Sequence, residues 1–324
     1  MNILLCSAGR RGELIKDFRK SLSPNSRIIA TDMSKYASAI YFADDFYLMP
    51  PIHDDTYISR LLEICRKEKI DAITTLIDPE IELLSRNRDL FTAIGVEVLA
   101  PYTETAEMCF DKWKLYQHLK KVGVSTVETF DNFCDAKRAL DGGMLTLPVF
   151  VKPRAGSGSV GARRVETIEE LQKACEEDPT LIIQELMDCE DMDADVYVDT
   201  ISHRPVSIFS KRKIETKIGG ASKTVSFKDP RLFEFLQNAL IHFKFNGPID
   251  VDLFCRDGQY YLSEINPRFG GAYLHAYGAG VDFVKLIENN INGITNMPIF
   301  GDYEENIVMM MYDSVVIKRE DEMG

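Results

Sequence analysis

Strand and helix patterns alternate along the first hundred residues, and this alternation restricts the possible folds more than any other feature of the chain. Short apolar runs typical of strands occupy 2–8, 27–32, 45–50, 71–77 and 96–101. Amphipathic helical patterns lie between them, most clearly at 56–70 and at 79–95, where Pro79 begins the expected helix and Gly95 ends it. Short connections between alternating strands and helices predict a doubly wound parallel sheet.

The pattern of expected helices and strands changes twice along the rest of the chain. Helices and strands are mixed from 111 to 185, and strand patterns dominate from 186 onwards, with helices expected at 230–243 and 281–292. A chain of 324 residues is too long for one ordinary core. We therefore expect a mixed α/β and α+β protein with a doubly wound domain at 1–110, a small α+β domain at 111–185 and an antiparallel α+β domain at 186–324.

Charge and cysteine content argue against several classes of protein. The net charge of −13 disfavours broad binding to nucleic acid or to anionic membranes. No apolar run reaches the length of a membrane span, and the first residues lack the pattern of a signal peptide. The seven cysteines form no C-x-x-C pair, and the five histidines form no zinc-binding pattern. The simplest account is a cytoplasmic protein with reduced thiols.

A glycine turn follows the first strand, and an acid ends the second. Gly9 and Gly12 form a G-x-x-G pattern, and Asp32 closes the next strand. The full G-x-G-x-x-G fingerprint of dinucleotide-binding proteins is missing, so an NAD-dependent oxidoreductase is disfavoured. The alternative is a tight turn that opens a helix.

The stretch FVKPRAGSGSVGARRV at 150–165 joins a strand lysine to a glycine-rich loop. Lys152 lies on the strand, and the loop consists of Gly156, Ser157, Gly158, Ser159, Val160 and Gly161. Glycines let backbone N–H groups approach a phosphate chain, and the serines and the lysine add donors. No G-K-[ST] follows, so this is not a Walker A loop. The pattern favours phosphate binding over its alternative, a flexible hairpin tip.

Two other stretches are ambiguous by themselves. Lys112, at the start of an expected helix, reads alone as an exposed lysine. The acids of the segment 182–199 could accept hydrogen bonds from a sugar or an exocyclic amine, or could form an exposed loop; they are Glu185, Glu190, Asp191, Asp193 and Asp195.

The stretch SEINPRFGG at 263–271 alternates an acid, an amide and a guanidinium, at Glu264, Asn266 and Arg268. The residues before it read as a strand, so Glu264 and Asn266 share one face, and Leu262 is expected on that face too. Either this is an exposed polar face or it binds a hard cation.

A second acid favours the cation. Asp252 precedes Glu264 by twelve positions across a turn at Asp257-Gly258, which places the two on neighbouring strands, facing the same way. With Asn266 they offer three oxygen ligands, a set suited to Mg²⁺. Arg268 could then hold an anionic group in a transition state.

In this order and spacing, the motifs resemble those of the ATP-grasp superfamily. The likeness is greatest to relatives of the carbamoyl-phosphate synthase large subunit, which include stand-alone carboxylate–amine ligases. It rests on YISRLLEICRKEKIDAITTLIDPE, the DK pair at 111–112, VFVKPRAGSGSVG, IIQEL, ADVYVD, GGASKTV and YLSEINPRFGG, and it covers nearly the whole chain. The resemblance implies an ATP-grasp fold in which the N-terminal domain precedes a small lid domain and a C-terminal domain with a metal site.

The resemblance also implies roles for single residues. Lys112 and Lys152 would contact the ATP phosphates, with the loop 156–161 as a lid. Glu185 and the backbone of Leu186 would hold adenine, and Asp191 or its neighbour Glu190 would hold the ribose.

At the other end of the nucleotide, Asp252, Glu264 and Asn266 would bind magnesium, and Arg268 would lie near the transferred phosphate. Lys213 and Lys223 would line the active site. Gly270 and Gly271 would let the next loop pass close to substrate.

By the same resemblance, the chain is expected to be an enzyme that uses ATP and two magnesium ions, with manganese as a substitute. A substrate carboxylate would attack the γ-phosphate to give an acylphosphate, and an amine would then displace phosphate. Its partners would be small molecules, with no nucleic acid or membrane, and a homodimer is the expected assembly. The alternatives are a kinase acting on a carboxylate or carbamate, and a non-catalytic ATP-binding protein.

Overall fold

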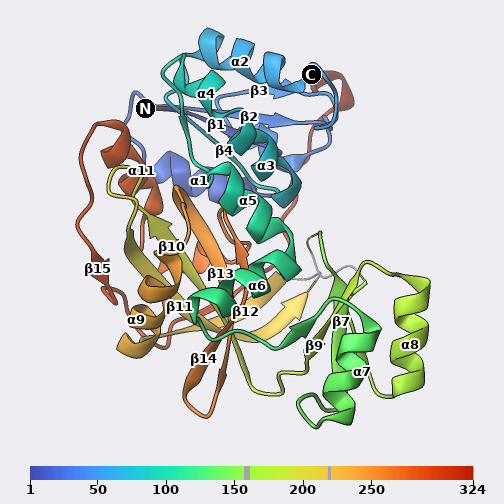
Figure 1. Cartoon of the computed structure of the whole chain (residues 1–324). Coiled ribbons are helices and arrows are strands. Elements are labelled where there is room, and N and C mark those ends of the chain that lie inside the picture. Colours follow the sequence, from blue (N-terminus) through green and yellow to red (C-terminus); the bar gives the residue numbers. More distant parts are fainter. Residues whose placement is uncertain (157–160, 218–219, 324) are drawn as a thin grey trace.

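The chain folds around three sheets that follow one another along the sequence (Figure 1). The computed structural model describes residues 1–156, 161–217 and 220–323. The first sheet is parallel and the other two are largely antiparallel, so the expected mixed fold class is confirmed. The expected boundaries after 110 and 185 fall between the sheets. Within the described residues, no helix combines the length and hydropathy needed to cross a membrane.

The first sheet is doubly wound, as the strand–helix alternation predicts. Its strand order is β3-β2-β1-β4-β5. The strands are β1 (Asn2–Cys6), β2 (Arg27–Asp32), β3 (Asp45–Leu48), β4 (Ala72–Thr75) and β5 (Glu97–Val98). The helical elements are α1 (Gly12–Ser21), η1 (Ser38–Phe42), α2 (Tyr57–Glu68), α3 (Asp78–Arg86), α4 (Arg88–Thr92) and α5 (Thr103–Phe110). Ile3 and Leu5 pack towards α1, whereas Leu4 and Cys6 pack towards α2 and α3.

The helix expected at 79–95 is two helices. It ends at Arg86 and restarts at Arg88, with Asn87 at the junction. The Asn87 side chain donates to the carbonyl of Leu83 at 2.9 Å. Such side-chain bonds to the backbone compete with helical hydrogen bonds, so a break at an asparagine has a physical cause that the apolar periodicity hides.

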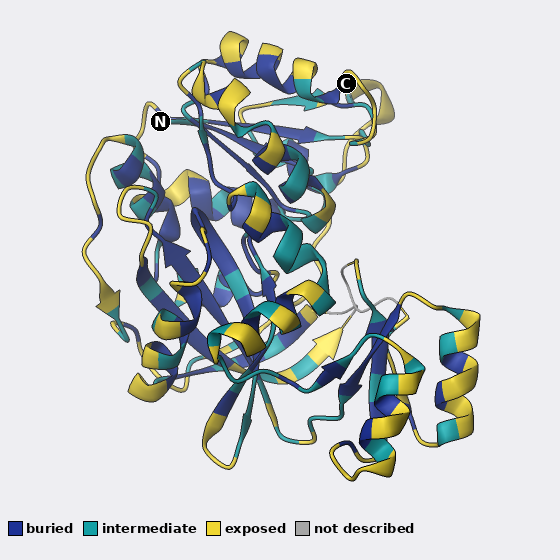
Figure 2. Cartoon of the chain, in the orientation of Figure 1, coloured by how far each residue is buried: buried dark blue, intermediate teal, exposed yellow. Residues whose placement is uncertain are grey.

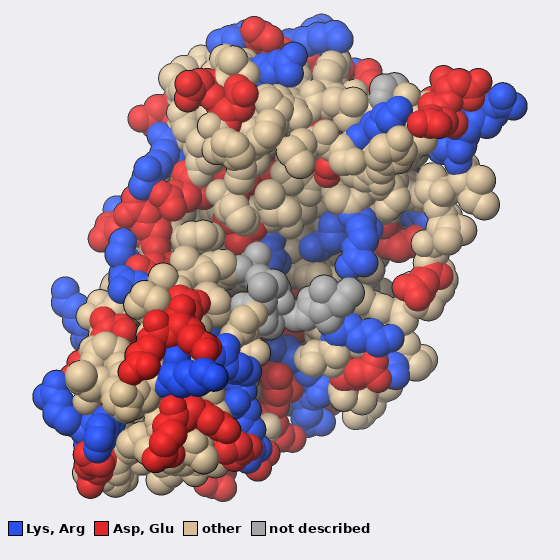
Figure 3. Space-filling model, turned by 90° about the vertical axis from the view of Figure 1, so that its right-hand side faces the viewer, with Lys and Arg blue, Asp and Glu red and all other residues tan. Residues whose placement is uncertain are grey.

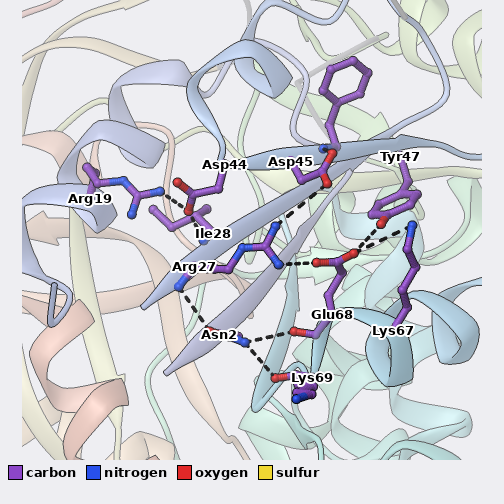
Figure 4. Close-up of polar contacts among 11 residues, drawn as sticks. Asn2, Arg19, Arg27, Ile28, Asp44, Asp45, Tyr47, Lys67, Glu68 and Lys69 are labelled. Atoms are coloured by element: carbon purple, nitrogen blue, oxygen red, sulfur yellow. Dashed lines mark hydrogen bonds and ion pairs between the residues drawn. The ribbon is translucent and has the colours of Figure 1, made fainter. Parts of the chain in front are cut away.

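A polar network joins the amino ends of β1 and β2 to α2 (Figure 4). Arg27 forms an ion pair with Glu68, which also accepts a hydrogen bond from the hydroxyl of Tyr47. Asn2 donates to the backbone carbonyls of Glu68 and Lys69 at 2.9 and 3.1 Å. These contacts close the amino edge of the sheet and leave the carboxyl edge for the loops described below.

The second sheet is small and carries two helices on one side, at the lower right of Figure 1. Its order is β6-β9-β7-β8. The elements are α6 (Lys112–Val122), β6 (Thr129–Phe130), α7 (Phe133–Asp141), β7 (Val149–Pro153), β8 (Arg163–Val165), α8 (Ile168–Glu177) and β9 (Leu181–Glu185). Its core is separate from the others and includes Val149, Val151 and Leu171.

The third sheet is the largest. Its main path runs β14-β13-β10-β11-β12-β16, and β15 pairs with β11. The strands are β10 (Glu190–Val198), β11 (Pro205–Lys217), β12 (Gly220–Phe227), β13 (Gly247–Arg256), β14 (Gln259–Asn266), β15 (Ile299–Phe300) and β16 (Val308–Met310). The helical elements are α9 (Pro230–Leu240), α10 (Tyr273–Gly278), α11 (Phe283–Ile291) and η2 (Glu320–Glu322).

One hydrophobic core joins the first sheet to the third. Figure 2 shows buried residues along the strands of both sheets and on the inward faces of their helices. Phe18 of α1 contacts Phe269, which follows β14, with ring centroids 5.4 Å apart. α1 packs against β2 on one side and against Phe269, α10 and α11 on the other, so the carboxyl edge of the first sheet is held beside the end of β14.

Candidate active site

The strand pair β13–β14 brings together the residues expected to bind metal. Asp252 is directly opposite Glu264, and Asp250 is directly opposite Asn266. The Asn266 side-chain amide donates to Oδ2 of Asp252 at 3.2 Å. The sequence therefore predicts the alignment of the two acids correctly.

The expected placement of Leu262 is wrong. The pairing register shifts between Asp252 and Leu253, so that Leu253 is opposite Leu262 and Ser263 is the extra residue of a bulge. Consecutive residues of β13 point to opposite faces, so Leu262 lies on the face away from Glu264 and is fully buried. A bulge of one residue resets the alternation, and the sequence pattern alone does not reveal it.

The carboxylates of this face are paired with lysines. Lys213 of β11 lies 2.6 Å from Oδ1 of Asp252 and 2.9 Å from Oδ1 of Asp191. Burial opposes the charge of Lys213, but the neighbouring acids outweigh it and hold the lysine pKa above its ordinary value. Lys152 of β7 forms an ion pair with Glu264 and thereby joins the small sheet to the large one.

The donor set fits magnesium. No group of three or more His, Cys, Asp and Glu side chains arranged to hold a metal occurs in the part of the chain that the structure describes. Two carboxylates and an amide face one another instead. Mg²⁺ typically takes one or two protein carboxylates and completes its shell with water and phosphate oxygens.

Lys112 approaches the same region from the start of α6. Its ammonium donates to the carbonyl of Gly156 at 2.8 Å. Asp111 caps the helix by accepting from the backbone N–H groups of Trp113 and Lys114, and it also binds Arg154. The glycine-rich loop is thus tied to α6 at its first residue. Gly161 is exposed at the far end of the loop, and the predictions for Ser157, Gly158, Ser159 and Val160 lie outside the described residues.

Glu185 ends β9, where the chain passes towards the third sheet. Its side chain forms an ion pair with Arg256, and its backbone N–H donates to the carbonyl of Glu128. The structure shows no partner for the N–H of Leu186 among the described residues.

Asp191 and Glu190 point to opposite faces of β10. Asp191 meets Lys213 on the face of Asp252 and Glu264, whereas Glu190 meets Arg212 at 3.6 Å on the other face. Burial raises the pKa of Asp191 above its ordinary value.

Lys223 is not on this face. Its neighbour Thr224 is directly opposite Lys213, so Lys223 points to the other side of β12, where its ammonium lies 2.7 Å from Glu215. The structure therefore separates Lys223 from Lys213.

Arg268 follows β14 and reaches the carboxyl edge of the first sheet. Its Nε lies 2.8 Å from Oδ1 of Asp78, and Nη2 donates to Oδ2 of Asp78 at 3.1 Å. Burial disfavours the charge of Arg268, but Asp78 and Asp250 outweigh it and raise its pKa. The sequence prediction missed Asp78, and the D-P-E triplet at 78–80 is the available signal.

Gly270 packs directly against the acids beneath the site. A Cβ atom placed on it would lie 2.8 Å from Oδ1 of Asp195 and 2.8 Å from Oδ1 of Asp250. Gly271, by contrast, faces open space. Asp195 and Asp193 are both bound to the fully buried Lys211. Gly270 is therefore the glycine required for the close approach of this loop.

A cleft opens among these elements. It is lined by Asp78, Ile81, Glu82, Ala106, Cys109, Phe110, Lys112, Gly156, Glu264, Ile265, Asn266 and Pro267. Figure 3 looks onto the side of the molecule that faces right in Figure 1 and shows it hollowed at its middle, with Lys and Arg side chains beside the hollow. The cleft thus joins the first sheet, the glycine-rich loop and the carboxylate pair.

Two family models match the chain. The ATP-grasp domain model matches residues 109–272, half of the chain, and the model of the PylC-like N-terminal domain matches residues 3–99. The likeness to carbamoyl-phosphate synthase is a looser fit, because the N-terminal match is to the PylC-like model.

Known proteins resemble the chain over most of its length. A pyruvate carboxylase subunit of Methanothermobacter thermautotrophicus is 24% identical over 315 residues, which are 87% of this chain and 62% of that protein. The chain therefore spans less than two thirds of this curated relative.

Solved structures of other proteins share the fold. The biotin carboxylase domain dimer of 2-oxoglutarate carboxylase from Hydrogenobacter thermophilus, in complex with MgADP, ADP and bicarbonate, aligns with a TM-score of 0.73 and 18% identity. That alignment covers 94% of this chain and 73% of the other. The L-amino acid ligase from Bacillus licheniformis aligns with a TM-score of 0.67 and 17% identity, over 91% and 75% of the two chains.

Proposed function

The chain belongs to the ATP-grasp domain family, and on that premise we propose that it is an ATP- and Mg²⁺-dependent ligase that activates a substrate carboxylate as an acylphosphate and joins it to an amine. The observation that carries the proposal is the direct opposition of Asp252 and Glu264, with Asn266 on the same face and Arg268 at its end. These residues combine a magnesium donor set with a buried guanidinium, as phosphoryl transfer requires.

Each residue of the cleft has a proposed task. Lys112 and Lys152 bind the ATP phosphates together with the loop 156–161, and Arg268 binds the transferred phosphoryl group. Glu185 and the backbone N–H of Leu186 hold adenine. Asp191 holds the ribose, a choice supported by its face of β10. Lys213 lies at the carboxylate pair and assists in neutralising the phosphates. The proposal gives Lys223 no task, because its ammonium pairs with Glu215 on the other face of β12.

The proposed magnesium ions are held by Asp252, Glu264 and Asn266, and when bound they supply positive charge to the phosphate oxygens. The protein's own part is positioning. The substrate carboxylate attacks the γ-phosphorus, forming an O–P bond as the bond to the leaving ADP oxygen breaks. The amine nitrogen then attacks the acyl carbon, phosphate leaves, and the amine proton passes to solvent or to phosphate.

The proposal also covers the metal ions, the substrates, the assembly and the location of the protein. It includes two magnesium ions replaceable by manganese, small-molecule substrates, a homodimer and a cytoplasmic location. The dimer is supported by the dimeric 2-oxoglutarate carboxylase domain that shares the fold, and the ligation by the L-amino acid ligase. We also keep the domain boundaries at 110 and 185 as part of the proposal.

The test is release of phosphate and ADP from Mg-ATP across a panel of amino acids, supplied singly and in pairs. Release that requires one particular pair, and that is lost in Glu264→Ala, supports the ligase. The matched control is Glu234→Ala, which removes an exposed carboxylate from α9 and leaves turnover intact. Release with a carboxylate alone at an undiminished rate indicates a kinase instead. ATP binding with no release for any pair indicates a binding protein.

A further inference from the structure

Asp78 contacts the Nε side of the Arg268 guanidinium, and the end formed by the two terminal nitrogens remains open. Nε and Nη2 of the guanidinium face the two carboxylate oxygens, and Nη1 donates to the carbonyl of Phe269 at 3.0 Å. Asp250 lies 3.8 Å from Nη1, beyond hydrogen-bond distance. An arginine side chain carries five N–H groups. Hydrogen bonds engage one on Nη1 and one on Nη2, and Nε lies against Oδ1 of Asp78 as an ion pair. One N–H on each terminal nitrogen therefore has no hydrogen-bond acceptor among the described residues. Two such groups form a fork that matches an oxyanion.

Asp78 is itself fixed by the first sheet. It begins α3, where a carboxylate is favoured by the helix dipole, and Pro79 restricts the backbone that follows. Glu80, two positions on, is fully buried. It accepts hydrogen bonds from the hydroxyls of Ser7 and Thr75, at 2.7 and 2.6 Å. The D-P-E triplet thus points one carboxylate back into the sheet and the other towards Arg268.

A third hydroxyl reaches Glu80 from α2, because Tyr57 donates to its other carboxylate oxygen at 2.5 Å. Ser7 follows β1 and Thr75 ends β4, so Glu80 locks α3 to the two central strands at their carboxyl edge. Burial raises the pKa of Glu80, and the three hydroxyls that donate to it oppose this rise because they stabilise the ionised carboxylate.

The loop that carries Arg268 is held from the same edge by a second contact. Nη2 of Arg11, between β1 and α1, donates to the carbonyls of Phe269 and Gly270 at 3.2 and 2.6 Å. The loop backbone is thus anchored by Arg11, and the Arg268 side chain by Asp78. Arg268 is only 14% exposed and Asp78 13%, so the pair is largely shielded from water.

We propose that Asp78 is a positioning residue: the D-P-E triplet of the first sheet holds the Arg268 guanidinium with its two open N–H groups aimed at the transferred phosphoryl group. The inference rests on the proposed function of Arg268 and gives the N-terminal sheet a part in the chemistry itself. A purely structural ion pair between the two sheets would affect folding but would not discriminate between the ground state and the transition state of the phosphoryl group.

That distinction sets the test. The probe is MgADP, with and without aluminium fluoride, which adds a planar mimic of the phosphoryl group in transfer and needs no knowledge of the substrate. We measure the dissociation constant for MgADP by calorimetry and the gain in affinity on adding aluminium fluoride. The intact protein is expected to bind roughly tenfold or more tightly with aluminium fluoride present.

In Asp78→Asn, we expect the affinity for MgADP to stay the same and the gain to fall by about tenfold, because the guanidinium loses its fixed orientation. Asp78→Glu keeps the charge, and hence the ion pair that stabilises the fold, but displaces the guanidinium by one methylene group. Asp78→Glu should therefore recover part of the gain in affinity that aluminium fluoride gives. Glu107→Gln, which removes a carboxylate bound to Arg86 at 2.9 Å outside the cleft, should behave like the intact protein.

The outcomes separate the two claims. If aluminium fluoride raises the MgADP affinity of both Asp78 variants as much as that of the intact protein, the positioning role is overturned and the proposed function stands. The positioning role is also overturned if an Asp78 variant loses affinity for MgADP alone by the same factor as for MgADP with aluminium fluoride. Asp78 would then act on the whole fold. No gain in the intact protein contradicts phosphoryl transfer at this site and removes both claims.

Discussion

The ammonium of Lys213 lies 2.6 Å from Oδ1 of Asp252, so a lysine binds the carboxylate proposed to hold magnesium. Lys152 likewise forms an ion pair with Glu264, another carboxylate proposed to hold magnesium. Both ammonium groups compete with a metal ion for the same oxygens. Bound phosphates would attract the lysines and release the carboxylates, so metal and nucleotide should bind together.

The first prediction concerns this competition. Lys213→Met should raise the affinity for Mn²⁺ in the absence of nucleotide by about tenfold, because it removes a positive charge next to Asp252 and Asp191. Electron paramagnetic resonance of free Mn²⁺ measures this directly. Lys223→Met, on the opposite face of the sheet, is the control and should not change the affinity. Equal metal binding by the intact protein and Lys213→Met would contradict the competition.

The two neighbouring glycines of the Arg268 loop should tolerate alanine very differently. In Gly270→Ala, the new methyl group would meet Asp195 and Asp250 at 2.8 Å, and the loop must shift. We expect a loss of about 1–3 kcal/mol in the free energy of unfolding and a large loss of turnover. In Gly271→Ala nothing lies within 4 Å, and stability should change by less than about 0.5 kcal/mol. Denaturant unfolding of both variants checks this, and equal stabilities would refute the close packing.

Asp191 and Glu190 provide a test of the nucleotide's ribose site. Asp191→Ala should raise the KM for ATP about tenfold, because it removes a charged hydrogen-bond acceptor on the cleft face. Glu190→Ala removes the same charge from the other face and should leave the KM unchanged. Steady-state kinetics with varied ATP decides between them, and the reverse order of effects would assign the ribose to Glu190.

Acid stability should depend on Asp199. This buried carboxylate accepts from the side-chain amides of Asn290 and Asn296, at 2.6 and 3.0 Å, and from the backbone N–H of Ser202 at 2.7 Å. Burial opposes its ionisation, but these donors outweigh it and lower its pKa to about 2.

Because the pKa of Asp199 is lower in the folded state than in the unfolded chain, its stabilisation is complete above about pH 4 and is lost as the pH falls towards 2. The effect amounts to about 2 kcal/mol. Asp199→Asn should lose that stability at neutral pH and show a flatter decline in acid. Urea unfolding at a series of pH values between 2 and 7 measures it, and parallel curves for the two proteins would count against the assignment.

The sequence predicts those parts of the site that depend on local spacing. The alternation of Glu264 and Asn266, and the turn between Asp252 and Glu264, place three oxygen-bearing side chains on one face without knowledge of the fold. The same reasoning fails at Leu262, because the bulge at Ser263 depends on how two strands pair and not on the periodicity of either one.

Contacts between distant segments are the part that sequence reasoning cannot reach. Asp78 and Arg268 are 190 residues apart, and they meet because the first and third sheets share one hydrophobic core. Lys223 also depends on pairing, because the sequence motif does not show that its neighbour Thr224 is the residue opposite Lys213. The assignment of a residue to one face of a strand depends on register, which single-strand patterns do not fix.

The most direct measurement of the central claim uses a substrate carboxylate labelled with ¹⁸O. If the carboxylate attacks the γ-phosphate of ATP, one of its oxygens leaves with phosphate when the amine adds. Mass spectrometry should then find one ¹⁸O in each released phosphate, in a reaction that Glu264→Ala abolishes. Release of phosphate without the label, in step with product formation, would show that no acylphosphate forms and would contradict the account.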